Sequence, residues 1–413
     1  MGRGAAPLSA RELRWPPVLL AVVCVATVGW AVVARLAEPD SPSGFYAPPE
    51  ALSGEPGTII RSEPLAPLAN GAAVTRVLYV STGLGDEPIA VSGIVVTPPG
   101  TPPAGGWTIV AWAHGTTGIV PRCAPSLESD GGTGKIPEVE QLIAEGHVVV
   151  ATDYPGLGTP GIHPYLVGES EGRAVLDSIR SARALLADKT SATAAIFGHS
   201  QGGHATLFAG ALAPTYAPEL KIVGIAPMSP PTALGELLAR DIHEPPGIVL
   251  TSYAVESWAA VYPGLAPDDI VHVGARAATK QLSRQCASPD ALQELADLPD
   301  VLALKARFLS ANPEDVPGWN THLSENSPSL THAIPEPVLI SQGEIDTLVR
   351  PDVTQSYFDA QCKAGAQVEL DAYPGIGHFD IRPVAPPHIL PWIEDRFAGK
   401  PVVQGCATKT VQP

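Results

Sequence analysis

ATAAIFGHSQGGHATLFA, residues 192–209, joins an apolar run to a helical stretch through the pentapeptide GHSQG. A strand, a tight turn and a helix in that order form the setting of a nucleophile elbow. Such a turn strains the central residue, Ser200, and requires small neighbours, which Gly198, Gly202 and Gly203 supply. The stretch predicts Ser200 as a nucleophile. The competing interpretation is a glycine-rich turn with a solvated serine.

An acid and a histidine follow Ser200 in the order that this kind of site requires. Residues 336–343 read as a buried strand, and Asp346 lies in the loop after it. Residues 367–373 alternate polar and apolar side chains as a strand does, and they lead into the glycine-flanked His378. We therefore expect His378 to follow the last strand of the sheet. Glu344 is the rival of Asp346 for the role of the acid.

The predicted roles follow from the chemistry of the three side chains. A serine hydroxyl is a poor nucleophile at neutral pH, so His378 must accept its proton as it attacks. Asp346 would fix the imidazole tautomer and stabilise the imidazolium. This chemistry requires neither a metal ion nor a cofactor, and we expect none.

A site of this kind must also stabilise a tetrahedral oxyanion, usually with two backbone N–H groups. One is expected from the residue after the nucleophile, Gln201. The second is expected from the HGTTG turn at residues 114–118, which follows the apolar strand 107–113. We assign it to the N–H of Thr116, with Gly115 as the alternative.

The composition is that of a globular protein. Of the 413 residues, 45% are hydrophobic and 16% are charged, and the formal net charge is −17. An acidic chain does not suit nucleic-acid binding, which needs basic surfaces, or electrostatic capture by anionic membranes.

The N-terminus predicts export. Three arginines precede an apolar run at residues 18–34, so residues 1–37 read as an export signal or, alternatively, an uncleaved signal anchor. Residues 38–57 are rich in proline, serine and glycine and read as a tether. The expected location is therefore extracellular or in the cell envelope, with membrane tethering if the segment is not cleaved.

The cysteines after this segment predict disulfide bonds. Cys123, Cys286, Cys362 and Cys406 are an even number in an exported chain, which indicates two disulfides. Four cysteines allow three pairings, and their spacing does not choose among them. None has the close spacing of a zinc site.

Strands and helices alternate along the rest of the chain, which predicts a mostly parallel sheet with helices on both faces. Residues 73–81 and 89–96 read as the first strands, and residues 169–186 as a helix. The expected core is residues 58–228 and 335–413. Residues 229–334 are too long for a simple connection and predict an inserted cap, with helical patterns at 232–240 and 291–309.

Six motifs, which span most of the chain after the tether, resemble the secretory lipase family typified by fungal lipase A. They are AHGTTG (113–118), DYPGLGTPGIHPYL (153–166), GHSQGG (198–203), PVLISQGEIDTLV (337–349), YPGIGH (373–378) and WIEDRFAG (392–399). The second and the last are far more specific than the serine pentapeptide.

The resemblance implies an α/β-hydrolase fold with a mainly helical cap and an activity on acylglycerols or related lipid esters. It places Ser200 as nucleophile, Asp346 as acid and His378 as base. It also implies the disulfides Cys123–Cys286 and Cys362–Cys406. The expected partner is a lipid ester, with transient contact of the cap with a lipid interface. An acyltransferase that uses the same acyl-enzyme with an alcohol acceptor is the alternative function.

Overall fold

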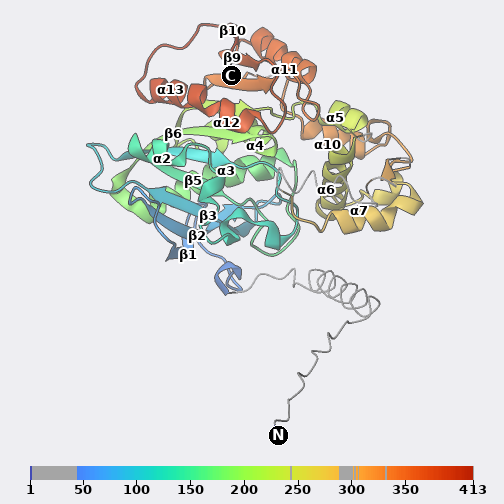
Figure 1. Cartoon of the computed structure of the whole chain (residues 1–413), viewed down its shortest axis with the longest axis horizontal. Helices are drawn as coiled ribbons and strands as arrows, with labels where there is room; N and C mark the ends of the chain where they lie inside the picture. The colour runs from blue at the N-terminus through green and yellow to red at the C-terminus, as the bar shows by residue number, and fades with distance from the viewer. Residues whose placement is uncertain are drawn as a thin grey trace. The chain divides into compact units, whose positions relative to one another are not determined.

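The apolar runs of the sequence pair into one ten-stranded sheet in the order β1-β2-β3-β5-β4-β6-β7-β8-β9-β10 (Figure 1). The neighbouring pairs β1–β2, β2–β3 and β3–β5 are antiparallel. Every other neighbouring pair, from β5 through to β10, is parallel. The strands are β1 (Ile59–Pro64), β2 (Ala73–Thr82), β3 (Pro88–Thr97), β4 (Trp107–Ala113), β5 (His147–Thr152), β6 (Thr190–His199), β7 (Lys221–Met228), β8 (Val338–Gly343), β9 (Val368–Tyr373) and β10 (Cys406–Thr410).

This computed structural model describes Met1 and residues 44–412, apart from 242–243, 288–300, 302–303, 306 and 331–332. The predicted export segment (1–37), the first part of the predicted tether and most of the helical pattern at 291–309 lie outside the described residues. None of the helices in the described part of the chain combines the length and apolar character that crossing a membrane demands.

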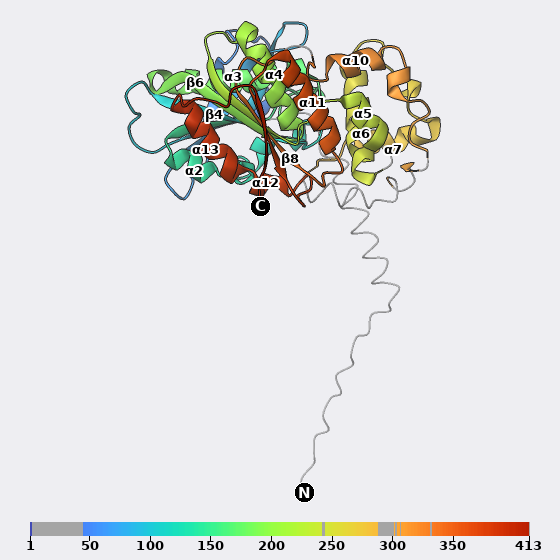
Figure 2. The same ribbon diagram turned by 90° about the horizontal axis from the view of Figure 1, so that it is seen from above.

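Helices cover both faces of the sheet, because the buried strands are apolar on both sides. In β4, Ile109 and Ala111 face one hydrophobic cluster, while Val110 and Trp112 face the other. Figure 2 shows α3, α4 and α11 on one face and α2, α12 and α13 on the other. These helices are α2 (Val139–Ala144), α3 (Gly168–Leu186), α4 (Gln201–Tyr216), α11 (Pro351–Ala364), α12 (Ile381–Val384) and α13 (Pro386–Phe397). The predicted mostly parallel sheet with helices on both faces is confirmed.

Two strands at the edges of the sheet escaped the sequence-based prediction. Residues 73–81 were predicted as the first strand, but β1 precedes them. His378 was predicted to follow the last strand, but β10 comes after it in the chain and pairs with the outer side of β9. Both added strands carry polar side chains and are partly exposed, as edge strands often are. They therefore lack the apolar alternation by which strands are recognised.

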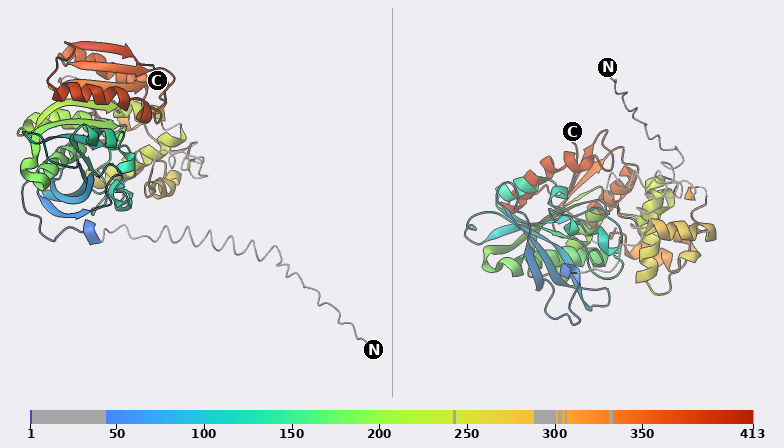
Figure 3. Two further views of the ribbon diagram at one scale, coloured as in Figure 1. Left: turned by 60° about the vertical axis from the view of Figure 1, so that its left-hand side comes forward. Right: turned by 60° about the horizontal axis from the view of Figure 1, so that its bottom comes forward.

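The described part of the chain between β7 and β8 is mainly helical and packs beside the sheet (Figure 3). Its described helices of four or more residues are α5 (Leu234–Asp241), α6 (Pro245–Val261), α7 (Arg276–Leu282) and α10 (Trp319–Glu325). The predicted pattern at 232–240 corresponds to α5, but α6 was not predicted. It begins with two prolines, which suit a first helical turn, and ten of its 17 residues are buried, so no single apolar face marks it.

Hydrogen bonds and a disulfide attach these helices to the core. In α6, the Trp258 indole donates to the carbonyl oxygen of Tyr165 (2.8 Å), and the Ser257 hydroxyl donates to the carbonyl oxygen of His163 (2.7 Å). The Cys123–Cys286 disulfide joins the loop after β4 to the chain after α7. The second disulfide, Cys362–Cys406, joins α11 to β10.

Candidate active site

The strand-to-helix turn between β6 and α4 holds Ser200 in a rare backbone conformation, with φ of 56° and ψ of −120°. A side chain at either flanking glycine would collide with the backbone. A Cβ at Gly198 would lie 2.3 Å from the carbonyl oxygen of Gly202, and one at Gly202 would lie 1.9 Å from that of Ala113. The glycines therefore permit a turn that presents the serine hydroxyl at the C-terminal end of β6.

The structure brings the three predicted catalytic side chains together from three separate loops. The Ser200 Oγ lies 2.9 Å from the His378 Nε2, and the His378 Nδ1 lies 2.8 Å from the Asp346 Oδ2. The carboxylate accepts from the Nδ1–H, which leaves the Nε2 free to accept the serine proton. The geometry is that of a nucleophile, a base and a group that orients the base.

Asp346 reaches the histidine because backbone groups hold its carboxylate in place. Its Oδ1 accepts the N–H groups of Leu348 (2.9 Å) and Val349 (2.8 Å), and its side chain is fully buried. Burial alone would raise the pKa of this carboxyl, but the contacts with His378 and Val349 outweigh burial and lower the pKa. Glu344, the rival acid, is exposed and makes no side-chain contact with His378.

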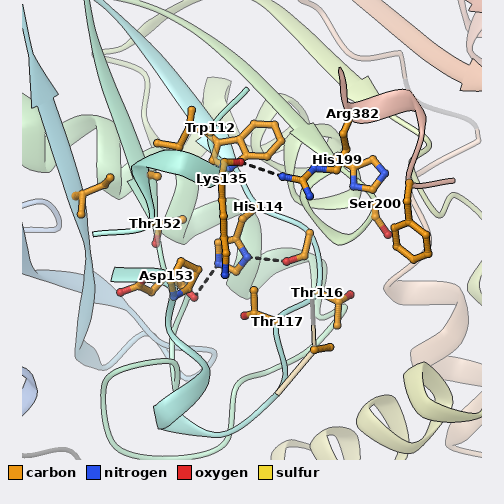
Figure 4. A pocket seen from close by; sticks show the side chains of 18 of the residues that line it. Trp112, His114, Thr116, Thr117, Lys135, Thr152, Asp153, His199, Ser200 and Arg382 are labelled. Atoms are coloured by element: carbon orange, nitrogen blue, oxygen red, sulfur yellow. Dashed lines mark hydrogen bonds between the residues drawn. The ribbon is translucent and has the colours of Figure 1, made fainter. Parts of the chain in front are cut away.

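The groups predicted for the oxyanion hole lie beside Ser200. Gln201 is the first residue of α4, so its N–H has no acceptor within the helix. The HGTTG turn passes close to the serine, because a Cβ at Gly115 would lie 3.7 Å from the Ser200 Cβ. Thr116 lines the same cavity as Ser200, and its hydroxyl is 2.9 Å from that of Tyr165 (Figure 4).

Two buried histidines next to the site were not predicted from the sequence. The His199 Nε2 lies 2.7 Å from the carbonyl oxygen of His378, and so it fixes the backbone of the base. The His114 Nδ1 lies 2.7 Å from the carbonyl oxygen of Gly115. Burial lowers the pKa of His199 well below its usual value and that of His114 to about 4, so both rings are neutral at pH 7. The position of His199 inside the serine pentapeptide is a sequence signal that could have placed it next to the site.

A buried carboxylate, Glu171 of α3, connects the nucleophile helix to the chain around it. It accepts hydrogen bonds from the Gln201 Nε2 (2.7 Å) and the backbone N–H of Leu166 (2.8 Å). Its Oε2 lies 2.8 Å from the His204 Nδ1, and the other nitrogen of that ring lies 2.7 Å from the carbonyl oxygen of Asn326. Glu171 is 0% exposed, so these partners take the place of water.

Replacing Glu171 with alanine is expected to lower the free energy of unfolding by about 3 kcal/mol, because several buried donors would lose their acceptor. Urea unfolding followed by tryptophan fluorescence measures the change. Glu169→Ala is the matched control on the same helix, since Glu169 is 48% exposed and pairs with Arg173 at the surface. It should cost less than about 1 kcal/mol. Equal losses in the two variants would contradict the prediction.

One group in the described chain has the composition of a metal site. Potential ligand atoms of Glu145, His147 and Glu394 all lie within 4.8 Å of one another. Both ring nitrogens of His147 already have protein partners, Thr108 (2.6 Å) and Glu394. His147 begins β5, whereas Ser200 follows the end of β6, and the two strands run parallel through β4. The group therefore lies at the N-terminal ends of the parallel strands, whereas the nucleophile lies at their C-terminal ends.

The sheet order, the elbow at Ser200 and the convergent serine, histidine and aspartate define an α/β-hydrolase. The chain belongs to the secretory lipase family, whose model matches residues 136–405. This membership confirms the resemblance and supports export of the protein.

Named relatives agree with this family placement, and a solved structure agrees with the fold. The chain is 28% identical to "Probable inactive lipase MT1628" of Mycobacterium tuberculosis, over 87% of this chain and 82% of the relative. It is 27% identical to "Secreted triacylglycerol lipase LIP2" of Malassezia globosa, over 94% and 88% of the two chains. The crystal structure of Candida antarctica lipase A superposes with a TM-score of 0.74 and 20% identity, covering 90% of this chain and 89% of that one.

Proposed function

We propose that the protein is an exported serine carboxylester hydrolase that forms an acyl-enzyme on Ser200. The observation that carries the proposal is the pair of contacts through His378, at 2.9 Å to Ser200 and 2.8 Å to Asp346. Membership in a family of lipases supports an ester as the substrate.

The geometry supports a two-step reaction. The Ser200 Oγ attacks the ester carbonyl carbon while the His378 Nε2 accepts the hydroxyl proton. The negative oxygen is stabilised by the N–H groups of Gln201 and Thr116. The carbon–oxygen bond to the alcohol breaks as His378 returns the proton to the leaving oxygen. Water then transfers a proton to His378 as its oxygen attacks the acyl carbon. The bond to the Ser200 Oγ breaks as His378 returns that proton to the Oγ, which releases the carboxylic acid and restores the serine hydroxyl.

An apolar cavity next to Ser200 supports lipid esters as substrates. Its volume is about 50 Å³, and Ser200 and His378 lie in its wall. Helices α5 and α6 supply much of the rest, including Leu234, Leu237 and Leu250. We propose that residues 229–334 act as a cap and that a hydrocarbon acyl chain enters this cavity. Acylglycerols or related lipid esters are the proposed class of substrate.

A fluorophosphonate probe tests the proposal directly, because it reacts only with an activated serine. We expect stoichiometric labelling, and mass spectrometry of the digest should place the adduct on Ser200. A folded protein that remains unlabelled would overturn the assignment and favour a loss of activity, as the name of the mycobacterial relative indicates for that protein. Product analysis with added glycerol tests the acyltransferase alternative, for which transfer must exceed hydrolysis.

A further inference from the structure

Two mainly apolar cavities meet at Ser200 and His378, and they differ in the charged side chains of their walls. The first is the apolar cavity beneath α5 and α6, which we call the cap cavity. The second, which we call the core cavity, has a volume of about 90 Å³ and extends from Ser200 over the ends of the sheet strands. Charged side chains lie in its wall, namely Lys135, Asp153 and Arg382 (Figure 4). Of the two cavities open to a substrate held at Ser200, only the core cavity therefore has lysine, arginine or acidic side chains in its wall.

Arg382 is the side chain of this wall whose charge is least compensated. It is partly buried, and its Nη2 donates to the carbonyl oxygen of Lys135 (3.1 Å). In the described part of the chain, no carboxylate lies in ion-pair contact with it. Burial lowers the pKa of its guanidinium, and an arginine nevertheless stays protonated at neutral pH. The other donors of the guanidinium remain available to a ligand.

The other two ionisable side chains in the wall of the core cavity already have protein partners. Lys135 forms an ion pair with Glu128 at the surface. Asp153 is 2% exposed and accepts hydrogen bonds from the Ser92 hydroxyl (2.6 Å) and the backbone N–H of Ser126 (2.9 Å). Burial also raises the pKa of the Asp153 carboxyl. Figure 4 shows Asp153 and Arg382 on opposite sides of the cavity, with Arg382 on the side of His199 and Ser200.

We propose that Arg382 binds an anionic group, a phosphate or a carboxylate, on the alcohol part of the ester. The inference rests on the proposed function, which assigns the hydrocarbon acyl chain to the cap cavity and so leaves the core cavity to the alcohol. A guanidinium offers planar paired donors that match the oxygens of either anion. The substrate class is then an acyl ester of an alcohol that carries an acidic group.

The test compares two soluble substrates with the same acyl chain, monooctanoylglycerol and its phosphate monoester, each below its micelle concentration. Arg382→Gln is expected to lower kcat/KM for the phosphate monoester by about tenfold or more and to change that for the neutral ester by less than about threefold. The loss should appear mainly in KM. Arg382→Lys should restore part of the selectivity, and added salt should weaken it in the wild type.

Arg276→Gln is the matched control for the removal of one positive charge. Arg276 begins α7, pairs with Glu256 and Asp268, and is not in the wall of either cavity, so both substrates should respond alike. Equal losses for the two esters in Arg382→Gln would overturn the inference. Inhibition of the wild-type enzyme gives a second measurement that does not depend on folding of the variant. Glycerol phosphate should compete at least about tenfold better than glycerol, and equal competition would also overturn it.

Failure of the proposed function gives a different result. A wild-type protein that hydrolyses neither ester and is not labelled by the fluorophosphonate overturns the serine-hydrolase assignment and this inference with it. A wild-type protein that is labelled and hydrolyses the neutral ester, but whose ratio of the two kcat/KM values is unchanged by Arg382→Gln, overturns only the anion subsite.

Discussion

Ser200→Ala is expected to lower ester turnover by about a million-fold while leaving the fold intact. Without the hydroxyl, His378 has no proton to accept and no acyl-enzyme forms, so the three side chains lose their joint effect, as in other serine triads. The substitution removes one half-buried hydroxyl from a turn whose shape depends on its glycines. Turnover of p-nitrophenyl butyrate measures the loss, and thermal unfolding confirms that the fold is retained.

The control for this variant lies in another element, helix α3. Ser178→Ala removes a buried hydroxyl of α3 that bonds only the backbone carbonyl of Val175 (2.7 Å), and it should leave turnover within about threefold of the wild type. Substantial turnover by the folded Ser200→Ala protein, above about one part in a thousand, would mean that another group carries the reaction.

The convergence of the three candidate catalytic residues could be predicted from the sequence because each is marked by local structure. The elbow needs a strand, three glycines and a helix within a few residues, and all are consecutive around Ser200. Asp346 follows an apolar strand and His378 follows an alternating one, and the C-terminal ends of parallel strands lie together at one side of the sheet. Which of the two acidic side chains after β8 is buried could not be predicted so directly. From the sequence, Asp346 is the preferred acid and Glu344 stays its rival, whereas in the fold only Asp346 is enclosed.

Other groups of the site depend on contacts between distant parts of the chain. Glu171 precedes Gln201 by 30 residues, and the carbonyl oxygen of Asn326 contacts His204 from 122 residues further on. On α3, Glu169 and Glu171 are both ordinary helix-start acids in sequence, yet one is exposed and one is fully buried. Arg382 likewise lies four residues after His378, and only the fold shows that, among the described residues, no carboxylate forms an ion pair with it.

Asp346→Asn should lower kcat by about ten-thousand-fold with little change in the shape of the site. The amide can donate to the His378 Nδ1, which favours the tautomer with its proton on Nε2. That nitrogen then can no longer accept the Ser200 proton. The amide also cannot stabilise the imidazolium that forms during acylation. Single-turnover kinetics with a p-nitrophenyl ester should show the loss in the acylation step, because His378 acts there as the base.

The pH dependence of stability distinguishes the carboxylate from its amide. The pKa of Asp346 is lowered in the folded protein, so its ionised form stabilises the fold at every pH above the unfolded value of about 4. This contribution is lost as the pH falls through the folded pKa. The difference in unfolding free energy between the wild type and Asp346→Asn should therefore be constant near neutrality and shrink below about pH 4.

Glu344→Gln supplies the matched control for Asp346→Asn, two residues away on the same loop. Because Glu344 is exposed and does not contact the histidine, its amide should retain at least about a third of the wild-type kcat. The reverse pattern, a large loss in Glu344→Gln and a small one in Asp346→Asn, would show that the exposed carboxylate moves to His378 when a substrate binds. The loop after β8 would then have to rearrange, which requires breaking the hydrogen bonds from Leu348 and Val349 to Asp346.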